Sequence, residues 1–377
     1  MPNYSGMWTL QAQMQAVSQS LWPLPIGMYS WGYNAYGELG QNNTTNYLAP
    51  TGVGSLSTWV SISIGESSTM ATTNSGTLWS WGRNTAGQLG QNDVVDRSSP
   101  VQIGALTNWA KIDSGYAHSI SVKTNGTLWT WGWNYSGQLG DGTVASRSSP
   151  VQVGALTTWL NVSGGYRFTV ASKTDGTLWS WGINGQGQIG DNTILSRSSP
   201  VQVGALTTWS KISAGSNHVT AVKTDGTLWS WGGNGDGELG LNDRVNRSSP
   251  VQVGALTTWS AVAKGSGHTI ALKTDGTLWT WGNNSFGQLG QSDTTYRSSP
   301  VQVGAINTWS LISGATNGGF SVKTDGTLWS FGRNNYGQLG IGNQISTSSP
   351  VQISTVATWS ILASGYNKSN MGAIITS

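Results

Sequence analysis

A period of 50 residues runs through this 377-residue chain and limits the folds that are open to it. A proline and a tryptophan recur at this interval: Pro50, Pro100, Pro150, Pro200, Pro250, Pro300 and Pro350; Trp59, Trp109, Trp159, Trp209, Trp259, Trp309 and Trp359. The copies follow one another in register, without an insertion. A fixed period of roughly 20 to 50 residues is typical of solenoids, propellers and other arrays, so the chain is expected to be built from one repeated unit.

Each copy predicts four short strands, because its apolar segments are short and are bounded by glycine or turn residues. In the copy from 209 to 258 we expect strands at 210–215, 219–223, 227–232 and 250–253. The pair Asp225-Gly226 predicts a two-residue type I′ hairpin, in which both central residues take positive φ. No segment within the repeats has a helical period. Each unit is therefore predicted to be a four-stranded antiparallel meander.

The two chain ends predict a closed ring. The last copy stops after its first two strands, and the first recognisable copy begins near Gly27 with its third strand. A seventh unit would then combine residues 351–377 with residues 27–50. Such sharing closes a propeller and leaves only short sheet edges, whereas an open solenoid needs capping repeats at both ends. The sequence therefore predicts an all-β, seven-bladed propeller over residues 27–377.

Two repeated motifs carry a family resemblance. The first is G-x-x-H, as in Gly115 to His118, and the second is L-W-x-W-G-x-N-x-x-G-Q-L-G, as in Leu78 to Gly90. With these motifs the chain resembles the RCC1 family of seven-bladed propellers over residues 27–377. The resemblance implies the propeller fold. It does not extend to the family's exchange factor, which carries an insertion and a basic tail that this chain lacks.

The family's ultraviolet receptor carries tryptophans on one face within a G-W-R-H-T motif. The matching positions here are Glu66, Tyr116, Tyr166, Ser216, Ser266, Thr316 and Tyr366. None of them is tryptophan, so photosensing is not expected.

Composition excludes several classes of protein. Charged residues make up only 9% of the chain, the net charge is +3, and no basic run occurs, so nucleic acid is not an expected partner. Cysteine is absent, which excludes disulfides and thiol chemistry. No apolar run approaches the length of a membrane span, so no membrane insertion is expected. Most of the 22 tryptophans are expected to pack between the sheets.

Two features that suggest chemistry have simpler explanations. Gly185, Gly187 and Gly190 match the dinucleotide fingerprint, but they follow a strand without opening a helix, which the phosphate site requires. His118, His218 and His268 share one repeat position on separate blades, which is too far apart for a shared metal. We therefore expect structural histidines, no catalytic residues, no bound metal, no cofactor and no enzymatic activity.

Residues 1–26 belong to no repeat and contain no charged side chain. The segment lacks the basic start of a secretory signal, and its apolar spacing predicts a short amphipathic helix from Thr9 to Ser18. It either packs on its own propeller or docks into a neighbouring subunit. The candidate docking residues are Trp8, Leu10, Met14, Val17, Leu21 and Trp22.

A second resemblance covers Gly6 to Gln11 and Trp22-Pro23, which are similar to short segments of marine bacteriophage structural proteins. It implies a virion component, such as a tail, fibre or capsid-surface protein, that attaches to other virion proteins through residues 1–26. The alternative is a cellular interaction scaffold of the RCC1 type, located in the bacterial cytoplasm or outside the cell.

Comparison of the seven copies identifies the regions that vary. These are the loop after the first strand and the loop after the third strand, which leave an antiparallel blade on the same face. The candidate partner-binding residues in them are Tyr33, Tyr36, Arg83, Trp133, Tyr135, Phe286, Arg333 and Tyr336. Aromatic and arginine side chains anchor protein interfaces, so we expect a host glycan or a protein to bind this face. The alternative is neutral drift of these loops after recent duplication.

Overall fold

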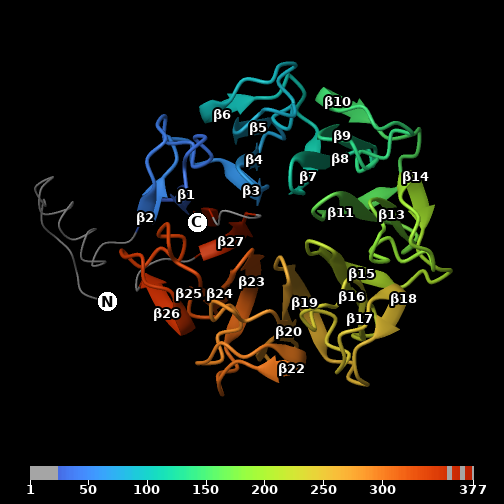
Figure 1. Ribbon diagram of the computed structural model, residues 1–377. Helices are drawn as coiled ribbons and strands as arrows, with labels where there is room; N and C mark the ends of the chain where they lie inside the picture. Colours follow the sequence, from blue (N-terminus) through green and yellow to red (C-terminus); the bar gives the residue numbers. More distant parts are fainter. Residues whose placement is uncertain (1–23, 355–358, 366–369, 376–377) are drawn as a thin grey trace, which may run out of the picture.

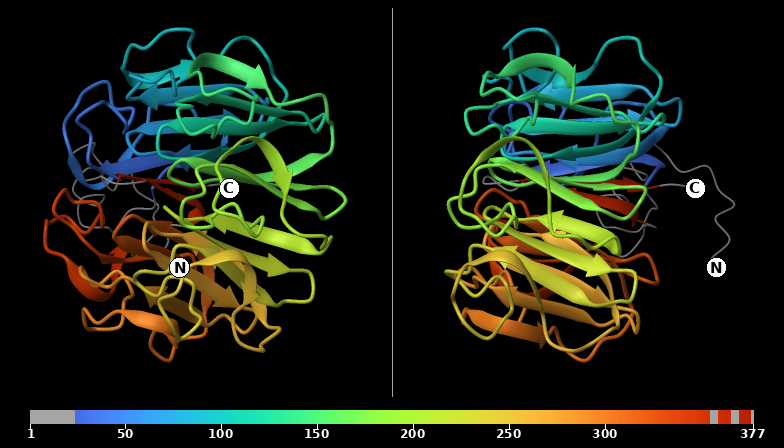
Figure 2. Two further views of the ribbon diagram at one scale, coloured as in Figure 1. Left: turned by 45° about the vertical axis from the view of Figure 1, so that its right-hand side comes forward. Right: turned by 90° about the vertical axis from the view of Figure 1, so that its right-hand side faces the viewer.

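The computed structural model describes residues 24–354, 359–365 and 370–375, which form a closed ring of seven four-stranded sheets (Figure 1). Each sheet is one blade, and its four strands run antiparallel, as the alternating pairings show. The turned views show the blades arranged around the ring, with connecting loops emerging on two opposite faces (Figure 2). The predicted seven-bladed, all-β propeller is confirmed.

The strands of the first four blades are as follows. Blade 1 contains β3 (Trp59–Ile64), β4 (Ser68–Thr73), β5 (Leu78–Gly82) and β6 (Arg97–Gln102). Blade 2 contains β7 (Trp109–Ser114), β8 (His118–Lys123), β9 (Leu128–Gly132) and β10 (Arg147–Gln152). Blade 3 contains β11 (Trp159–Gly164), β12 (Phe168–Lys173), β13 (Leu178–Gly182) and β14 (Arg197–Gln202). Blade 4 contains β15 (Trp209–Ala214), β16 (His218–Lys223), β17 (Leu228–Gly232) and β18 (Arg247–Gln252).

The strands of the last three blades complete the ring. Blade 5 contains β19 (Trp259–Lys264), β20 (His268–Lys273), β21 (Leu278–Gly282) and β22 (Arg297–Gln302). Blade 6 contains β23 (Trp309–Ala315), β24 (Gly318–Lys323), β25 (Leu328–Gly332) and β26 (Thr347–Ser354). Blade 7 contains β27 (Trp359–Ser364), β28 (Asn370–Ile375), β1 (Gly27–Gly32) and β2 (Tyr47–Gly52).

Blade 7 joins the two ends of the chain, as predicted. Its strand order is β2-β1-β28-β27, and β1 pairs with β28 in one unbroken register from Gly27↔Ile375 to Gly32↔Asn370. In addition, Trp31 Nε1 donates a hydrogen bond to the backbone oxygen of Gln338 in blade 6 at 3.0 Å. The ring is therefore closed by strand pairing within blade 7 and by a tryptophan contact to blade 6.

The fourth strand of each blade is longer than predicted. In blade 4 it begins at Arg247 rather than at Pro250, because Gly232 pairs with Arg247 across an irregularity in the register. Pro250 lies within this strand, which is the outer edge strand of the blade. Proline is tolerated at a sheet edge because its missing N–H removes no ladder hydrogen bond there.

The hairpins between the second and third strands differ from the predicted type I′ turn. Gly226 has φ +77°, whereas Asp225 does not have positive φ. Gly226 N donates to Lys223 O and Lys223 N donates to Thr227 O, both at 3.0 Å. This is the three-residue hairpin in which a type I turn is followed by a left-handed glycine in a bulge. The position of the turn was correctly predicted, but its type was wrong.

Tryptophan side chains fill the space between neighbouring blades. Trp81 and its equivalents Trp31, Trp131, Trp181, Trp231 and Trp281 are fully buried. The indole of Trp81 donates from Nε1 to the backbone oxygen of Glu38 in the preceding blade at 3.0 Å. It also lies 6.1 Å from Trp59, which begins the first strand of its own blade. The prediction that most tryptophans belong to the core is confirmed for the described residues.

The candidate docking residues Trp8, Leu10, Met14, Val17, Leu21 and Trp22 lie outside the described residues, as does the helix predicted at residues 9–18. The docking hypothesis therefore remains a prediction. In the described ranges, no helix has the length and apolar character that a membrane crossing needs.

Candidate functional site

The loops after the first and third strands lie together on one face of the ring. Arg83 N, in the loop after β5, donates to Ser67 O in the loop after β3 at 2.7 Å. The same contact recurs in blade 2, where Trp133 N donates to Ala117 O at 2.8 Å. The two sets of variable loops therefore share one surface, as the sequence predicts. We call this surface, formed by the loops after the first and third strands, the variable face.

Backbone hydrogen bonds connect the loops after the first strands from one blade to the next. Glu66 N donates to Tyr116 O at 2.9 Å, and Tyr166 N donates to Ser216 O at 3.3 Å. Ser216 N in turn donates to Ser266 O at 3.1 Å. These bonds fix the spacing of the side chains that follow the first strands.

Five side chains of blades 2 and 3 form a compact group, which we call the aromatic cluster: Tyr116, Trp133, Tyr135, Tyr166 and Arg167. The rings of Tyr116 and Tyr166 are 4.3 Å apart, and Trp133 lies 6.0 Å from Tyr116 and 5.8 Å from Tyr135. The guanidinium of Arg167 lies 4.4 Å from the Trp133 ring and 5.0 Å from the Tyr166 ring. Tyr135 is 73% exposed, so the cluster presents an aromatic side chain directly to solvent.

The aromatic cluster continues onto blades 1 and 7. Burial and a hydrogen bond to the Glu66 carboxylate raise the pKa of the Tyr116 hydroxyl, so this hydroxyl remains protonated and donates to Glu66. Glu66 also pairs with Arg83 at 3.5 Å, and the Arg83 guanidinium lies 4.9 Å from the Tyr36 ring. A chain of contacts therefore runs across four blades, from Tyr36 to the aromatic cluster.

The other four predicted residues form two further pairs on the variable face. The rings of Tyr33 and Tyr336 are 5.0 Å apart, which joins blade 7 to blade 6. The guanidinium of Arg333 lies 4.8 Å from the Phe286 ring, which joins blade 6 to blade 5. The structure thus brings the eight candidates together as neighbouring pairs.

Sequence comparison missed four participants: Glu66, Tyr116, Tyr166 and Arg167. All four lie in the variable loop after the first strand. Glu66, Tyr116 and Tyr166 share the position at which three blades carry Ser216, Ser266 or Thr316, and Arg167 stands at the next position, where other blades carry Ser67, Ala117 or Gly267. Their departure from these small residues was the available signal. It was not enough, because their contacts cross between blades and depend on the rotation from one blade to the next.

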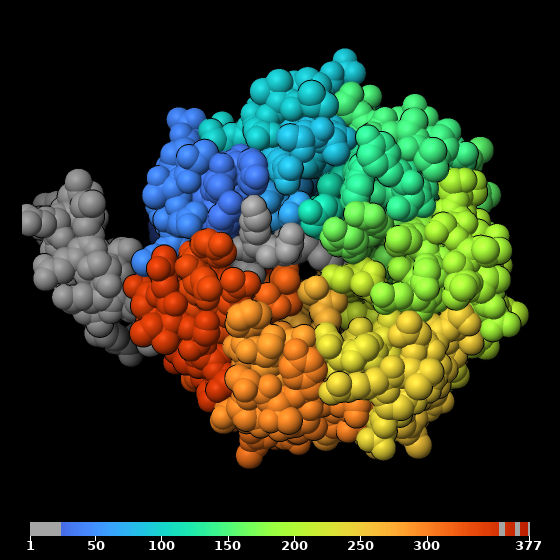
Figure 3. Space-filling model, viewed as in Figure 1, coloured from blue at the N-terminus to red at the C-terminus, as the bar shows by residue number. Residues whose placement is uncertain are grey.

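The first strands line a central channel that contains a cavity of about 280 Å³. Figure 3 shows the ring hollowed at its centre, on the face seen in Figure 1. Lys264 of blade 5 reaches across it, and its Nζ lies 2.9 and 2.8 Å from the two carboxylate oxygens of Asp113 in blade 2. The carboxylate also accepts from Ser63 Oγ and from Gly164 N, both at 2.9 Å. This ion pair therefore connects four blades through the channel.

The three histidines are buried at the start of their second strands. His118 Nε2 lies 3.0 Å from Thr169 Oγ1, whose own hydroxyl donates to Gln138 O. Nε2 must therefore be the protonated nitrogen that donates to Thr169. Burial, together with a smaller effect of the Lys264 charge, lowers the pKa of His118 to about 3. His118 is thus a neutral structural residue at physiological pH.

His218 repeats this arrangement, with Nε2 3.2 Å from Thr269 Oγ1 and a pKa lowered to about 3 by burial. At His268 the equivalent position of the next blade is Gly319, which has no hydroxyl, and burial lowers the pKa to about 4. Within the ranges that the structure describes, no three His, Asp or Glu side chains are placed to hold a metal ion.

The last glycine of the dinucleotide-like motif serves the packing of the blades. Gly190 has φ +77°, and a Cβ there would lie 2.6 Å from Nε1 of Trp231 in the next blade. The segment after Gly190 contains no helix and leads to strand β14. The motif therefore provides room for an indole and lacks the helix N-terminus that a phosphate site uses.

Comparisons with known proteins agree with this architecture. The model of the regulator of chromosome condensation (RCC1) repeat matches residues 27–72, 75–122, 125–172, 175–222, 225–272, 275–318 and 325–367. A second RCC1 repeat model matches five segments between residues 59 and 288. No curated protein matches the sequence.

Solved structures show the same fold at low identity. Yeast RCC1 (Prp20), solved with Kap60 bound to it, is 20% identical over 94% of this chain and 90% of that chain, with a TM-score of 0.83. Human WBSCR16 is 18% identical over 94% of this chain and 100% of that chain, also with a TM-score of 0.83. A separate structure of Prp20p from Saccharomyces cerevisiae, described with its binding to Gsp1p and histones, gives a TM-score of 0.81 at 20% identity, over 97% of this chain and 95% of that chain. Because the repeat model matches nearly the whole propeller, this chain belongs to the regulator of chromosome condensation (RCC1) repeat family.

Proposed function

We propose that this chain is a non-enzymatic interaction scaffold whose variable face binds a protein partner. The observation that carries the proposal is the continuous run of contacts from Tyr36 through Arg83 and Glu66 to the aromatic cluster. Aromatic and arginine side chains in such an arrangement provide the anchors of protein interfaces. The side chains in this run of contacts are already held by stacking and ion pairing, which reduces the conformational entropy that they lose when a partner binds.

Arg167 indicates the chemistry of the partner. Its guanidinium stacks between Trp133 and Tyr166, and no ion pair connects it to another described residue. A stacked guanidinium retains its edge for hydrogen bonding to a carboxylate. We therefore expect the partner to place an acidic side chain beside Arg167 and an apolar or aromatic group on Tyr135.

The relatives favour a protein over a glycan as this partner. The structures of yeast RCC1 are described with Kap60, Gsp1p and histones, all of which are proteins. These relatives are too distant to transfer a particular partner. They support the class of partner only, so the host glycan considered from the sequence remains the second candidate.

The test compares two double variants as baits. Trp133→Ala/Tyr135→Ala removes the exposed part of the aromatic cluster, and Thr174→Ala/Thr224→Ala changes exposed hairpin residues on the opposite face. Quantitative mass spectrometry of bound proteins should show a partner that the unaltered chain and the control retain and the cluster variant loses. Equal retention by all three baits would contradict the proposal.

The virion role remains a separate prediction, because it depends on residues 6–23, all of which lie outside the described residues. It requires the full chain to sediment with a particle of megadalton size in lysate of the source. Deletion of residues 1–23 should abolish that co-sedimentation while leaving the propeller folded. A free chain near its own mass of 39.7 kDa would reject the virion role and leave the scaffold proposal intact.

A further inference from the structure

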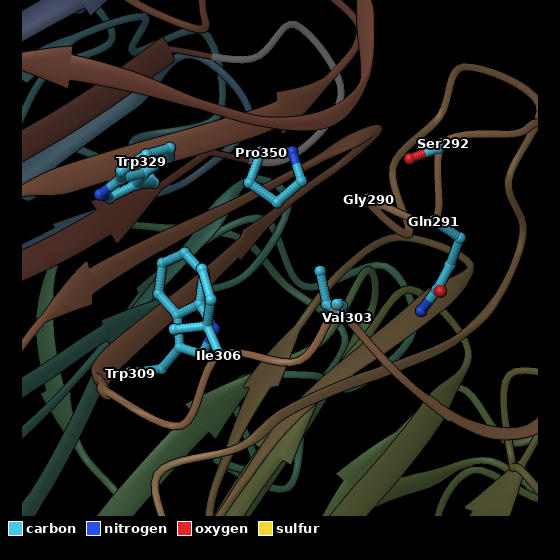
Figure 4. Close-up of a pocket in the computed structure, with 9 residues that line it drawn as sticks. Gly290, Gln291, Ser292, Val303, Ile306, Trp309, Trp329 and Pro350 are labelled. Carbon is cyan, nitrogen blue, oxygen red and sulfur yellow. The ribbon is translucent and has the colours of Figure 1, made fainter.

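Grooves of similar size recur between neighbouring blades, away from the aromatic cluster. Four of them have volumes of about 400, 380, 430 and 410 Å³. Between blades 2 and 3 the walls are formed by Val153, Leu156, Trp179 and Pro200. Figure 4 shows the equivalent groove between blades 5 and 6, with Trp329, Pro350 and Ile306 around the opening. Volumes of this size are typical of sites for small molecules.

The apolar walls of these grooves are partly open to solvent. Leu156 is 50% exposed, and the equivalent residues Leu106 and Leu256 are 51% and 49% exposed. Trp179 is half-buried, whereas the core tryptophan Trp181 of the same strand is fully buried. A ligand entering the groove would therefore cover both an aliphatic side chain and an indole.

Three of the grooves also contain a lysine ammonium group. Lys123, Lys173 and Lys273 line them, and their Nζ atoms lie 3.7, 3.7 and 3.5 Å from the rings of Trp129, Trp179 and Trp279. Lys123 and Lys173 are only 6% and 7% exposed. Burial lowers the pKa of all three, which reflects the loss of water around a charged group.

These ammonium groups lack polar partners within the described ranges. No hydrogen bond or ion pair of the Nζ atoms of Lys123, Lys173 or Lys273 is present there, although an ammonium has three N–H donors. The nearby hairpin carboxylate of Asp175 influences Lys173 through its charge, but its Oδ1 accepts hydrogen bonds from Thr177. Stacking on an indole stabilises the positive charge without using its donors.

We propose that the grooves containing Lys123, Lys173 and Lys273 each bind a small apolar carboxylate, with its chain on the indole and leucine and its carboxylate on the ammonium. The combination of an apolar wall with one buried cation fits an amphiphilic anion of this kind. A neutral apolar molecule would leave the N–H donors unused. Blade 1 provides an internal contrast, because Thr73 replaces the lysine and bonds instead to Ser75 and Thr77.

The first test uses the unaltered full-length chain. Titration with 4-(4-fluorophenyl)butanoate, followed by fluorine NMR, should show saturable binding of at least three molecules per chain, one for each groove with a lysine. The dissociation constant should be on the order of 1 mM, as expected for a ligand of this size. The matched amide should bind about tenfold more weakly, because it lacks the charge-assisted hydrogen bond. Absence of saturation, or equal binding of acid and amide, would overturn the proposal.

The second test uses matched variants. Lys123→Met/Lys173→Met/Lys273→Met keeps an unbranched side chain over each indole and removes the charge, so the number of sites that prefer the acid should fall by three. The control Lys111→Met/Lys211→Met removes exposed lysines of first strands outside the grooves and should leave acid binding unchanged. Near-ultraviolet circular dichroism checks that the tryptophan packing of each variant is intact. If the triple variant does not fold, the comparison of acid with amide on the unaltered chain still decides the question.

Discussion

At the scale of single residues, the ion pair across the channel is the largest departure from the repeat. The positions equivalent to Asp113 carry serine in four blades: Ser63, Ser163, Ser213 and Ser313. The positions equivalent to Lys264 carry uncharged residues, most of them small, such as Gly164, Ala214 and Gly314. Two blades have therefore acquired opposite charges that meet across the ring, at side-chain exposures of 17% each.

Removing one charge of this pair should destabilise the propeller. In Lys264→Met the carboxylate of Asp113 keeps Ser63 and Gly164 as donors but loses its counter-charge, so we expect a loss of about 1–3 kcal/mol in the free energy of unfolding. The double variant Asp113→Ser/Lys264→Ala restores residues typical of the repeat and should recover most of that loss. Urea unfolding followed by tryptophan fluorescence measures both, and a double variant no more stable than Lys264→Met would contradict this account.

The buried histidines make stability depend on pH. The pKa of His218 is about 3 in the folded chain against an ordinary value of 6.5, so below pH 6.5 the unfolded chain binds more protons than the folded chain. Stability therefore falls as pH falls through this window, by about 1.4 kcal/mol per pH unit for each such histidine. His218→Asn should reduce that slope by the same amount between pH 6 and pH 5. Asparagine is chosen because Asn370 takes this place in blade 7, where it pairs with Gly32 as His218 pairs with Gly232. Urea midpoints at several pH values measure the slope, and an unchanged slope would show that His218 is not the titrating group.

At the scale of the structural element, the hairpins within blades and the links between blades depend on glycine for two separable reasons. Gly226 has φ +77°, and a Cβ there would lie 2.1 Å from the backbone oxygen of Thr257. Gly254 has φ +61°, but a Cβ there would meet nothing within 4 Å. The first glycine is needed for both conformation and space, whereas the second is needed for conformation alone.

Alanine substitutions should separate these two effects. Gly254→Ala should cost about 1 kcal/mol of unfolding free energy, which is the usual cost of a left-handed conformation for alanine. Gly226→Ala should cost at least about 3 kcal/mol, because the hairpin must also move away from the Thr257 backbone. Thermal and urea unfolding of the two variants give the comparison. Equal losses would mean that the hairpin relaxes freely and that the close approach is unimportant.

The elements were predictable from the sequence to different degrees. Glycine boundaries and the 50-residue period were sufficient to place the first three strands of a blade within about one residue. The type of the Asp225-Gly226 turn could not be predicted in this way, because an Asp-Gly pair is compatible with two kinds of hairpin turn. The choice depends on Thr227, whose N–H and hydroxyl both donate to Asp225 Oδ1 and whose Oγ1 accepts from Trp229 Nε1.

The candidate site shows the same limit. Variation among the copies identified the loops of the variable face and, in them, Tyr33, Tyr36, Arg83 and Tyr336 as separate candidates. The structure pairs Tyr36 with Arg83 and Tyr33 with Tyr336. It did not identify the Lys264 contact with Asp113, which joins residues 151 positions apart. Such contacts depend on the diameter of the ring and on the angle between blades, and neither quantity can be predicted from the period of the sequence.

At the scale of the whole molecule, closure depends on the last two strands. Deletion of residues 351–377 removes β27 and β28 and shortens β26, which leaves β1 without its inner neighbour. We expect the truncated chain to unfold at least 10 °C below the full chain, or to aggregate through the exposed edge, because about 1 kcal/mol alone shifts the midpoint by a few degrees. Differential scanning calorimetry and size-exclusion chromatography make the measurement.

The matched control for this truncation is deletion of residues 1–23, which removes none of the described strands. That variant should unfold like the full chain. If both deletions lowered the melting temperature equally, the stability of the ring would depend on the N-terminal segment as much as on the shared blade.

The shared blade also has a consequence for synthesis on the ribosome. The strand Gly27–Gly32 is translated before its partner, which begins at Asn370, so it must wait until blades 1 to 6 have been translated. At roughly 5–20 residues per second this delay lasts tens of seconds, during which the central strands of a nascent blade have an open edge. A message cut short near its end would yield an open arc rather than a smaller ring. The ring thus distinguishes chains that contain both partner strands from chains that lack the second, and chaperones that bind exposed strand edges should associate with the nascent chain until β28 appears.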